Sequence, residues 1–241
     1  MAISSRRSKQ ALTLIVLGCL ALAAWLDRQP AREASPNPPQ STESAGQTAD
    51  SGLVASVHDG DTLQLRDGTR VRLASIDTPE MGKDGRRSWE YSLKAREELE
   101  RLVRGKRISL ESPDGAALHP DSFGRLVALV SVEGVGLVNE HLVRQGLAWL
   151  YPHEDTPPWL EGRLLEAQRE AMERGRGLWP SLLAWKPMQG PMTGNVRSRR
   201  FFPASAPELK EISRRNLRDF KGLREAFWEG FAPARHAFNW P

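Results

Sequence analysis

Four carboxylate side chains and one arginine are gathered on two short segments of this sequence. Residues 57–63 read VHDGDTL, and residues 72–80 read RLASIDTPE. The carboxylates are Asp59, Asp61, Asp77 and Glu80, and the arginine is Arg72. Asp and Glu are depleted in strands, so their placement around short apolar runs needs a reason. Carboxylates beside an arginine suit a hard, oxygen-seeking cation that holds a phosphate group.

Two further segments extend this pattern. Arg125 opens the apolar run LVALV, directly after Phe123-Gly124, and residues 138–148 read VNEHLVRQGLA. In their order and separations, the four segments resemble the thermonuclease (staphylococcal nuclease-like) family. The resemblance covers roughly residues 53–180, about half of the chain, and implies a nuclease on a small closed barrel.

The resemblance implies a metal site at one edge of that barrel. Asp61, Asp77 and the backbone carbonyl of Thr78 are the expected ligands of Ca²⁺, and Mn²⁺ could share such a site. Three protein oxygens leave much of the roughly six to eight coordination positions of Ca²⁺ to water and phosphate. Asp59 is expected to support this site from behind, or to cap the turn.

The resemblance also assigns the groups that act on the phosphate. Glu80 is expected to activate or orient the attacking water, and Arg72 and Arg125 to hold the phosphate with planar, two-pronged donors. From the sequence, alanine at either arginine should leave folding intact and remove most turnover. Tyr151 could stack on a base or a sugar, or could pack at the barrel edge.

Each of these residues also has a structural interpretation when taken alone. The two aspartates of the first segment could cap a turn, Arg72 could pair with Asp67, and Glu80 could be a charge at a helix start. The functional interpretation is favoured because all the segments occur together in the family's order. One departure concerns the substrate: the family often has a tyrosine before the Gly-Arg pair, where Phe123 lacks the hydroxyl, and a basic residue where Ser122 stands.

Alternating apolar residues predict the strands that position these groups. Residues 53–57, 63–65, 71–73, 107–111 and 125–132 read as strands, and residues 88–103, 136–145 and 156–175 as helices. A three-residue loop ending on Gly68 would place Leu63, Leu65, Val71 and Leu73 on one buried face. We therefore predict an α+β fold, a five-stranded OB-type barrel with about three helices.

The first 26 residues have the pattern of an export signal or membrane anchor. Basic residues at positions 6–9 precede an apolar run over residues 11–26, which is typical of a secretory signal or a short membrane anchor. Cleavage near Ala23, lipidation at Cys19 and retention as an anchor all stay open. Each alternative predicts a secreted or cell-envelope protein whose remainder lies on the outer side of the membrane.

Composition divides the remainder into three parts. Residues 27–52 are rich in Pro, Ser, Thr and Gln, which predicts a disordered linker. The predicted nuclease domain, residues 53–181, follows it. The slightly longer stretch 53–185 carries 18 basic and 21 acidic residues. This acidic excess does not exclude a nucleic-acid substrate, because a bound divalent cation reverses the sign of the local charge. With one cysteine in the whole chain, an intramolecular disulfide is excluded.

The remaining stretch, residues 182–241, is basic and aromatic. Its residues from 186 onward hold 11 basic against 5 acidic side chains. The capping-box spacing of Ser205 and Glu208 predicts a helix over about residues 205–221, with basic and apolar residues interleaved. Such a helix could dock on the domain, hold a nucleic-acid backbone or lie on an anionic membrane, and docking is favoured.

The sequence therefore predicts a monomeric, Ca²⁺-dependent endonuclease that hydrolyses DNA, RNA or both and leaves 3′-phosphate ends. One alternative is an OB module that binds nucleic acid without cutting it. Another is an envelope protein that uses its tail to hold a partner. The complete set of charged residues argues against both.

Overall fold

The computed structural model describes residues 50–80 and 90–238, which belong to one compact unit. The expected signal or anchor, most of the expected linker and residues 81–89 lie outside the described ranges. Within those ranges, no helix has both the length and the apolarity needed to cross a membrane.

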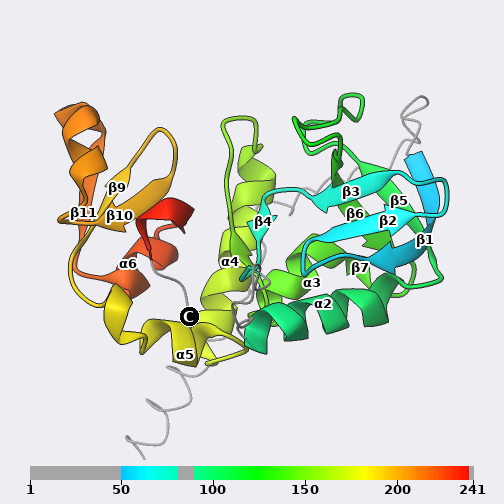
Figure 1. Ribbon diagram of the computed structural model, residues 1–241, viewed down its shortest axis with the longest axis horizontal. Helices are drawn as coiled ribbons and strands as arrows, with labels where there is room; N and C mark the ends of the chain where they lie inside the picture. Colours follow the sequence, from blue (N-terminus) through cyan, green and yellow to red (C-terminus); the bar gives the residue numbers. More distant parts are fainter. Residues whose placement is uncertain (1–49, 81–89, 239–241) are drawn as a thin grey trace, which may run out of the picture. The chain divides into compact units, whose positions relative to one another are not determined.

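Five strands close into a barrel. They are β1 (Asp50–Val57), β2 (Thr62–Leu65), β3 (Arg70–Leu73), β5 (Arg107–Glu111) and β6 (Leu126–Val132). Neighbouring strands pair antiparallel in the order β3-β2-β1-β5-β6, and a parallel pairing of β3 with β6 closes the barrel (Figure 1). The short strand β7 (Gly136–Leu137) adds to the far side of β6. The predicted OB-type α+β barrel is confirmed.

The β2–β3 hairpin has the register that the alternation of its residues predicts. Leu63, Leu65, Val71 and Leu73 are all buried, and each contributes about 1.5–3 kcal/mol through the apolar surface that it removes from water. The loop ends on Gly68 with a positive φ of 93°. Its NH donates to the carbonyl of Leu65 at 3.1 Å, so the three-residue loop is confirmed.

The strand β1 begins earlier than the sequence suggested. Residues 50–52, expected to end the linker, pair with β5 through Asp50↔Leu110, Ser51↔Ser109 and Gly52↔Ile108. These residues have little apolar side chain, so their strand conformation comes from backbone pairing with a partner far along the chain.

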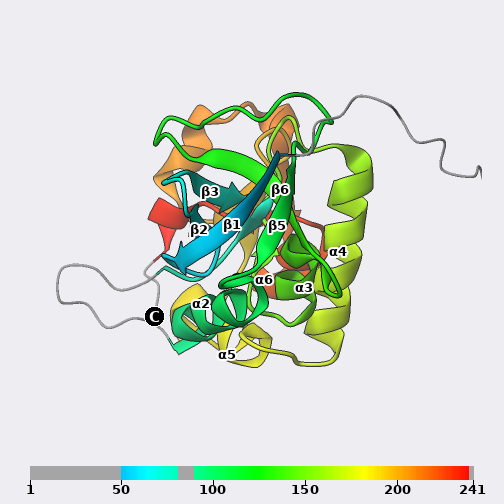
Figure 2. The ribbon, with the colours of Figure 1, turned by 90° about the vertical axis from the view of Figure 1, so that its right-hand side faces the viewer.

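Helices cover part of the barrel and extend the domain. They are α2 (Glu90–Val103), α3 (Val138–Arg144), α4 (Pro158–Glu173) and α5 (Trp179–Leu183). Helix α2 lies beside the barrel (Figure 2), and its Leu99, Leu102 and Val103 belong to the barrel's apolar core. Helix α3 starts two residues later than expected because residues 136–137 pair with β6. The predicted start of α2 at Ser88 lies outside the described ranges.

The last part of the chain forms what we call the C-terminal module, residues 186–238. Its sheet has the order β11-β9-β10-β12 and is accompanied by helix α6 (Figure 1). The strands are β9 (Met192–Asn195), β10 (Arg200–Pro203), β11 (Leu217–Phe220) and β12 (Ala232–Pro233), and the helix is α6 (Leu223–Trp228). Four 3₁₀ turns complete it: η1 (Lys186–Met188), η2 (Pro207–Glu211), η3 (Arg214–Asn216) and η4 (Arg235–Ala237).

The prediction of one helix over residues 205–221, and with it of a helical extension, is wrong. That stretch forms two short 3₁₀ turns, and β11 then pairs antiparallel with β9. Pro207 fits the start of the first turn, and backbone pairing with a distant strand overrides the weak helical periodicity.

The C-terminal module packs on the helices that follow the barrel. Phe227 of α6 makes edge-to-face contacts with Trp179 and Phe201, at centroid distances of 5.0 and 5.1 Å. Buried Gln168 on α4 accepts from the NH of Leu150 at 2.8 Å and donates to the carbonyl of Phe227 at 2.6 Å. Docking on the domain, one of the three uses considered for this tail, is what the structure shows.

Candidate active site

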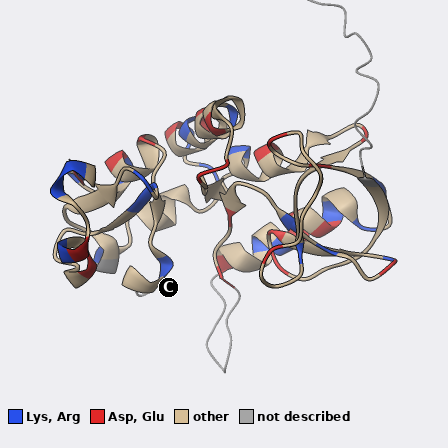
Figure 3. Ribbon diagram, turned by 90° about the horizontal axis from the view of Figure 1, so that it is seen from above, with Lys and Arg blue, Asp and Glu red and all other residues tan. Residues whose placement is uncertain are grey.

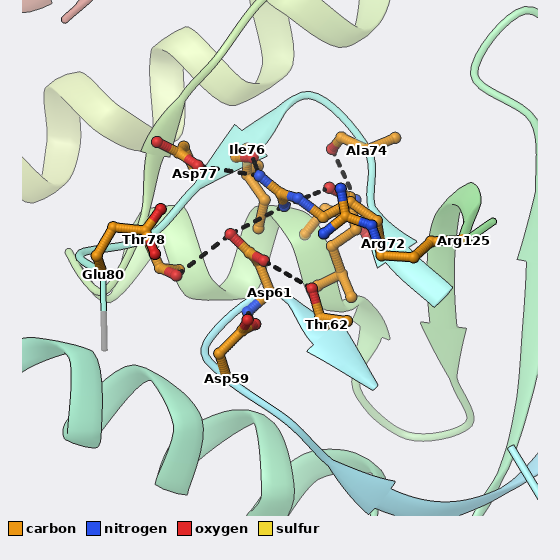
Figure 4. Close-up of polar contacts among 12 residues, drawn as sticks. Asp59, Asp61, Thr62, Arg72, Ala74, Ile76, Asp77, Thr78, Glu80 and Arg125 are labelled. Atoms are coloured by element: carbon orange, nitrogen blue, oxygen red, sulfur yellow. Dashed lines mark hydrogen bonds and ion pairs between the residues drawn. The ribbon is translucent and has the colours of Figure 1, made fainter. Parts of the chain in front are cut away.

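All eight residues singled out from the sequence line one open cleft of about 980 Å³. They are Asp59, Asp61, Arg72, Asp77, Thr78, Glu80, Arg125 and Tyr151. Figure 4 shows seven of them, all but Tyr151, which come from the β1–β2 turn, from β3, from β4 (Ile76–Asp77) and the segment after it, and from the residue just before β6. A cleft with a few converging polar groups is the usual form of a binding or catalytic site.

The β1–β2 turn holds Asp61 in a buried position. Its backbone NH donates to the Asp59 carboxylate at 3.1 Å, so that Asp59 caps the turn. The Asp61 carboxylate accepts from the hydroxyls of Thr62 at 3.1 Å and Thr78 at 3.2 Å. Gly60 allows this approach, because a Cβ there would lie 2.8 Å from the Thr78 hydroxyl oxygen.

A bent connection brings Asp77 onto the same site. Ser75 adopts a left-handed φ of 58°, which is costly for a residue other than glycine and redirects the chain into β4 (Ile76–Asp77). Strand β4 pairs with β8 (Trp149–Leu150), and Asp77 is fully buried.

Asn139 holds that connection in place. Its side-chain amide donates to the carbonyl of Ala74 at 2.9 Å, and its amide oxygen accepts from the NH of Val130 at 2.9 Å. Asn139 is itself fully buried, so these bonds lie in a low-dielectric interior where losing them is costly.

Arg72 bridges the two buried aspartates (Figure 4). One guanidinium nitrogen lies 2.9 Å from Asp61, and the other lies 2.9 Å from Asp77. The same nitrogens donate to the carbonyls of Leu73 and Ile76, each at 3.0 Å. The two carboxylates therefore contact the same guanidinium group from either end.

Arg125 lies directly before β6, the strand that pairs with the strand of Arg72. The parallel register pairs Arg72 with Val127, so both arginines lie at the seam that closes the barrel. Asp121 holds Arg125 through its carboxylate, at 3.0 Å from Nε and 2.7 Å from Nη2. The Phe123 ring lies under the guanidinium, 5.2 Å from centroid to Cζ.

Comparisons with known proteins identify the family of the chain. The family model described as Staphylococcal nuclease homologue matches residues 70–181. A relative from Escherichia coli named "Uncharacterized endonuclease" is 34% identical over 131 residues, which are 53% of this chain and 76% of that protein. The chain belongs to the staphylococcal nuclease family. Micrococcal nuclease from Shigella flexneri is 27% identical over 147 residues, 56% of this chain and 77% of that protein.

Membership of the staphylococcal nuclease family makes the protein a nuclease, a hydrolase whose substrate is nucleic acid. The matched range includes Arg72, Asp77, Glu80 and Arg125. The C-terminal module lies beyond residue 181, where the family match ends.

The module nevertheless reaches the cleft, which the sequence did not suggest. Arg235 forms ion pairs with Asp77 and with the exposed Glu80. Arg200 lies over the Tyr151 ring, 3.4 Å from its centroid, so one face of the predicted stacking residue is covered by a guanidinium. Basic residues occur on both the barrel and the module (Figure 3), and their excess in the tail was the only signal in the sequence.

Burial sets the electrostatics of the carboxylates. Removal from water raises the pKa of Asp61 to about 6, although the neighbouring Arg72 acts in the opposite direction. The Asp59 charge adds to the rise in the pKa of Asp61. The charged form of a buried carboxylate is poorly solvated, so a bound positive ion stabilises that form.

The donor set fits a hard divalent cation. Asp61 and Asp77 converge, and the Thr78 backbone lies directly after Asp77; oxygen ligands of this kind suit Ca²⁺. Across the described residues, no three His, Cys, Asp or Glu side chains form a metal-binding group. The expected ligand set has only two acidic side chains, because its third donor is a backbone carbonyl. Much of the coordination would therefore come from water and substrate.

Proposed function

We propose that this member of the staphylococcal nuclease family is a Ca²⁺-dependent endonuclease. It hydrolyses phosphodiester bonds of DNA, RNA or both by in-line attack of water, and it leaves 3′-phosphate ends. The observation that carries the proposal is the convergence of Asp61 and Asp77 on one guanidinium, beside Glu80 and Arg125, in one open cleft.

In this proposal, Asp61, Asp77 and the Thr78 carbonyl hold the cation. Bound Ca²⁺ supplies positive charge that polarises a phosphate oxygen and neutralises charge in the transition state. Mn²⁺ is the alternative ion, because carboxylate and carbonyl oxygens suit both. Asp59 supports the site by capping the turn that holds Asp61.

The other side chains of the cleft act on the phosphate and the water. Arg72 and Arg125 donate to the phosphate oxygens, whose charge grows as the transition state forms. Glu80, half-exposed on the cleft wall, accepts a proton from the attacking water. Tyr151 lines the same cleft and contacts the sugar or base with the ring face opposite Arg200.

The products of cleavage test the proposal. The full chain is incubated with end-labelled single-stranded DNA, double-stranded DNA and RNA, in Ca²⁺, in Mn²⁺ or in excess chelator. We expect cleavage with Ca²⁺ and none with chelator, and fragments that accept a 3′ extension only after phosphatase treatment. Tight binding without cleavage in either metal would make the cleft a site that reads nucleic acid without cutting it.

We further propose that the protein acts as a monomer outside the cytoplasm, secreted or tethered to the envelope membrane. The charge pattern of residues 1–26 supports export. Fractionation of cells tests the location, and light scattering on the purified chain tests the mass. Recovery in the cytoplasm, or a stable dimer, would contradict these two points.

A further inference from the structure

Arg235, from the C-terminal module, makes direct contact with the carboxylates of the active site. Its Nε donates to Asp77 Oδ2 at 2.9 Å, and its Nη2 pairs with the other oxygen of the same carboxylate. Its Nη1 pairs with Glu80. A single guanidinium from outside the family match thus joins a predicted metal ligand and the predicted base.

The backbone of the module fixes where this side chain begins. Strand β12 pairs parallel with β10 just before Arg235, and the NH of Ala234 donates to the carbonyl of Phe201 at 2.9 Å. On the other side, Phe238 packs edge-to-face on Phe201, 5.5 Å between centroids. Anchored on both sides, Arg235 is held at the cleft as part of the folded module.

The contacts of Arg235 occupy the oxygens that a metal ion needs. Both oxygens of Asp77 face Arg235, and one of them also accepts from Arg72 at 2.9 Å. A cation ligated by Asp77 must therefore displace a guanidinium. Arg235 is the one expected to move, because its side chain is 40% exposed while that of Arg72 is 14% exposed.

We propose that Arg235 is a cation supplied by the chain itself that competes with the divalent ion for Asp77 and Glu80. The C-terminal module thereby sets the affinity of the nuclease for its metal. The inference rests on the proposed function, since it takes Asp77 as a metal ligand. Metal binding moves the guanidinium off Asp77 and frees Glu80 for water.

Calorimetric titration with Ca²⁺, without nucleic acid, tests the competition in the full chain. We compare the wild type with Arg235→Gln, which removes the charge, and with Arg235→Lys, which keeps the charge but lacks the two-pronged geometry. Arg70→Gln is the matched control: Arg70 lines the same cleft and donates to the carbonyl of Phe123.

We expect Arg235→Gln to bind Ca²⁺ roughly tenfold more tightly than the wild type, the scale of losing one charge-assisted contact. Arg235→Lys should fall between the two, and Arg70→Gln should stay within about twofold of the wild type. If Arg235→Gln does not fold, the lysine variant carries the comparison.

Three results would overturn the competition. They are unchanged or weaker Ca²⁺ binding in both Arg235 variants, equal tightening in Arg70→Gln, and no Ca²⁺ binding by any variant. A wild type that cleaves DNA with Ca²⁺ while the Arg235 variants keep its affinity would refute only this inference. A wild type that cleaves equally well in chelator would refute the proposed function.

Discussion

Replacing Arg72 by alanine should destabilise the fold as well as stop cleavage. The Arg72 side chain is 14% exposed, pairs with the carboxylates of Asp61 and Asp77 at 2.9 Å, and donates to two carbonyls at 3.0 Å. Without it, two buried carboxylates face each other with one fewer positive charge between them. The sequence alone suggested intact folding, and these contacts change that expectation.

The size of the effect follows from the burial of the ion pairs. Removing one partner of a buried pair costs about 3–5 kcal/mol, a large part of the roughly 5–15 kcal/mol that stabilises a typical domain. Arg125 provides the comparison, since it pairs with Asp121 on a loop where both side chains are at least 20% exposed. Alanine at Arg125 should cost no more than about 1 kcal/mol.

Urea unfolding in excess chelator measures both variants. The fluorescence of the buried Trp149 and Trp179 reports the transition. Arg72→Ala should lose several times more free energy of unfolding than Arg125→Ala, and added Ca²⁺ should restore part of that loss by binding only the folded state. Equal losses in the two variants, or a loss below about 1 kcal/mol for Arg72→Ala, would refute the reasoning.

Three further comparisons test parts of the fold. Because burial raises the pKa of Asp61 to about 6, its contribution to stability is complete below its ordinary value of 3.8 and is lost as the pH rises through 6. In chelator, the wild type should therefore lose about 2–3 kcal/mol of unfolding free energy relative to Asp61→Asn between pH 4 and pH 8. A difference in unfolding free energy between the two proteins that does not change with pH would count against the raised pKa. Asn139→Leu leaves the buried NH of Val130 unpaired, so urea unfolding should show a loss of about 1–3 kcal/mol or more in the free energy of unfolding. No loss would mean that other contacts hold the connection to β4. Gly146→Ala should reduce the melting temperature far more than Gly134→Ala, because both have positive φ but only the first would place a Cβ 2.3 Å from a carbonyl oxygen, and equal effects would exclude that close approach.

The barrel and its site could be predicted because their signals are local. Alternation in β2 and β3 fixes which residues are buried, and Gly68 fixes the loop between them. The charged residues fall at strand ends or on the strand that closes the barrel, so their convergence follows from the pairing of β3 with β6. Their separate roles in the reaction stay predictions.

The C-terminal module could not be predicted in the same way. Its strands are short, and residues 217–220 become a strand only by pairing with residues 192–195. The contact of Arg235 with Asp77 joins residues 158 positions apart, and no spacing rule reaches that far. Asn139 lay in a quoted segment, yet its bonds to Ala74 and Val130 depend on how that segment packs on β6.

The most direct test of the account is the turnover of Glu80→Gln in the full chain with Ca²⁺ and DNA. Glu133→Gln, an exposed carboxylate at the turn after β6, is the control. If Glu80 accepts the proton of the attacking water, kcat should fall by roughly 10²–10⁴-fold with KM little changed, and the control should match the wild type. A Glu80→Gln enzyme with wild-type kcat would contradict the role of Glu80 as the base that accepts this proton.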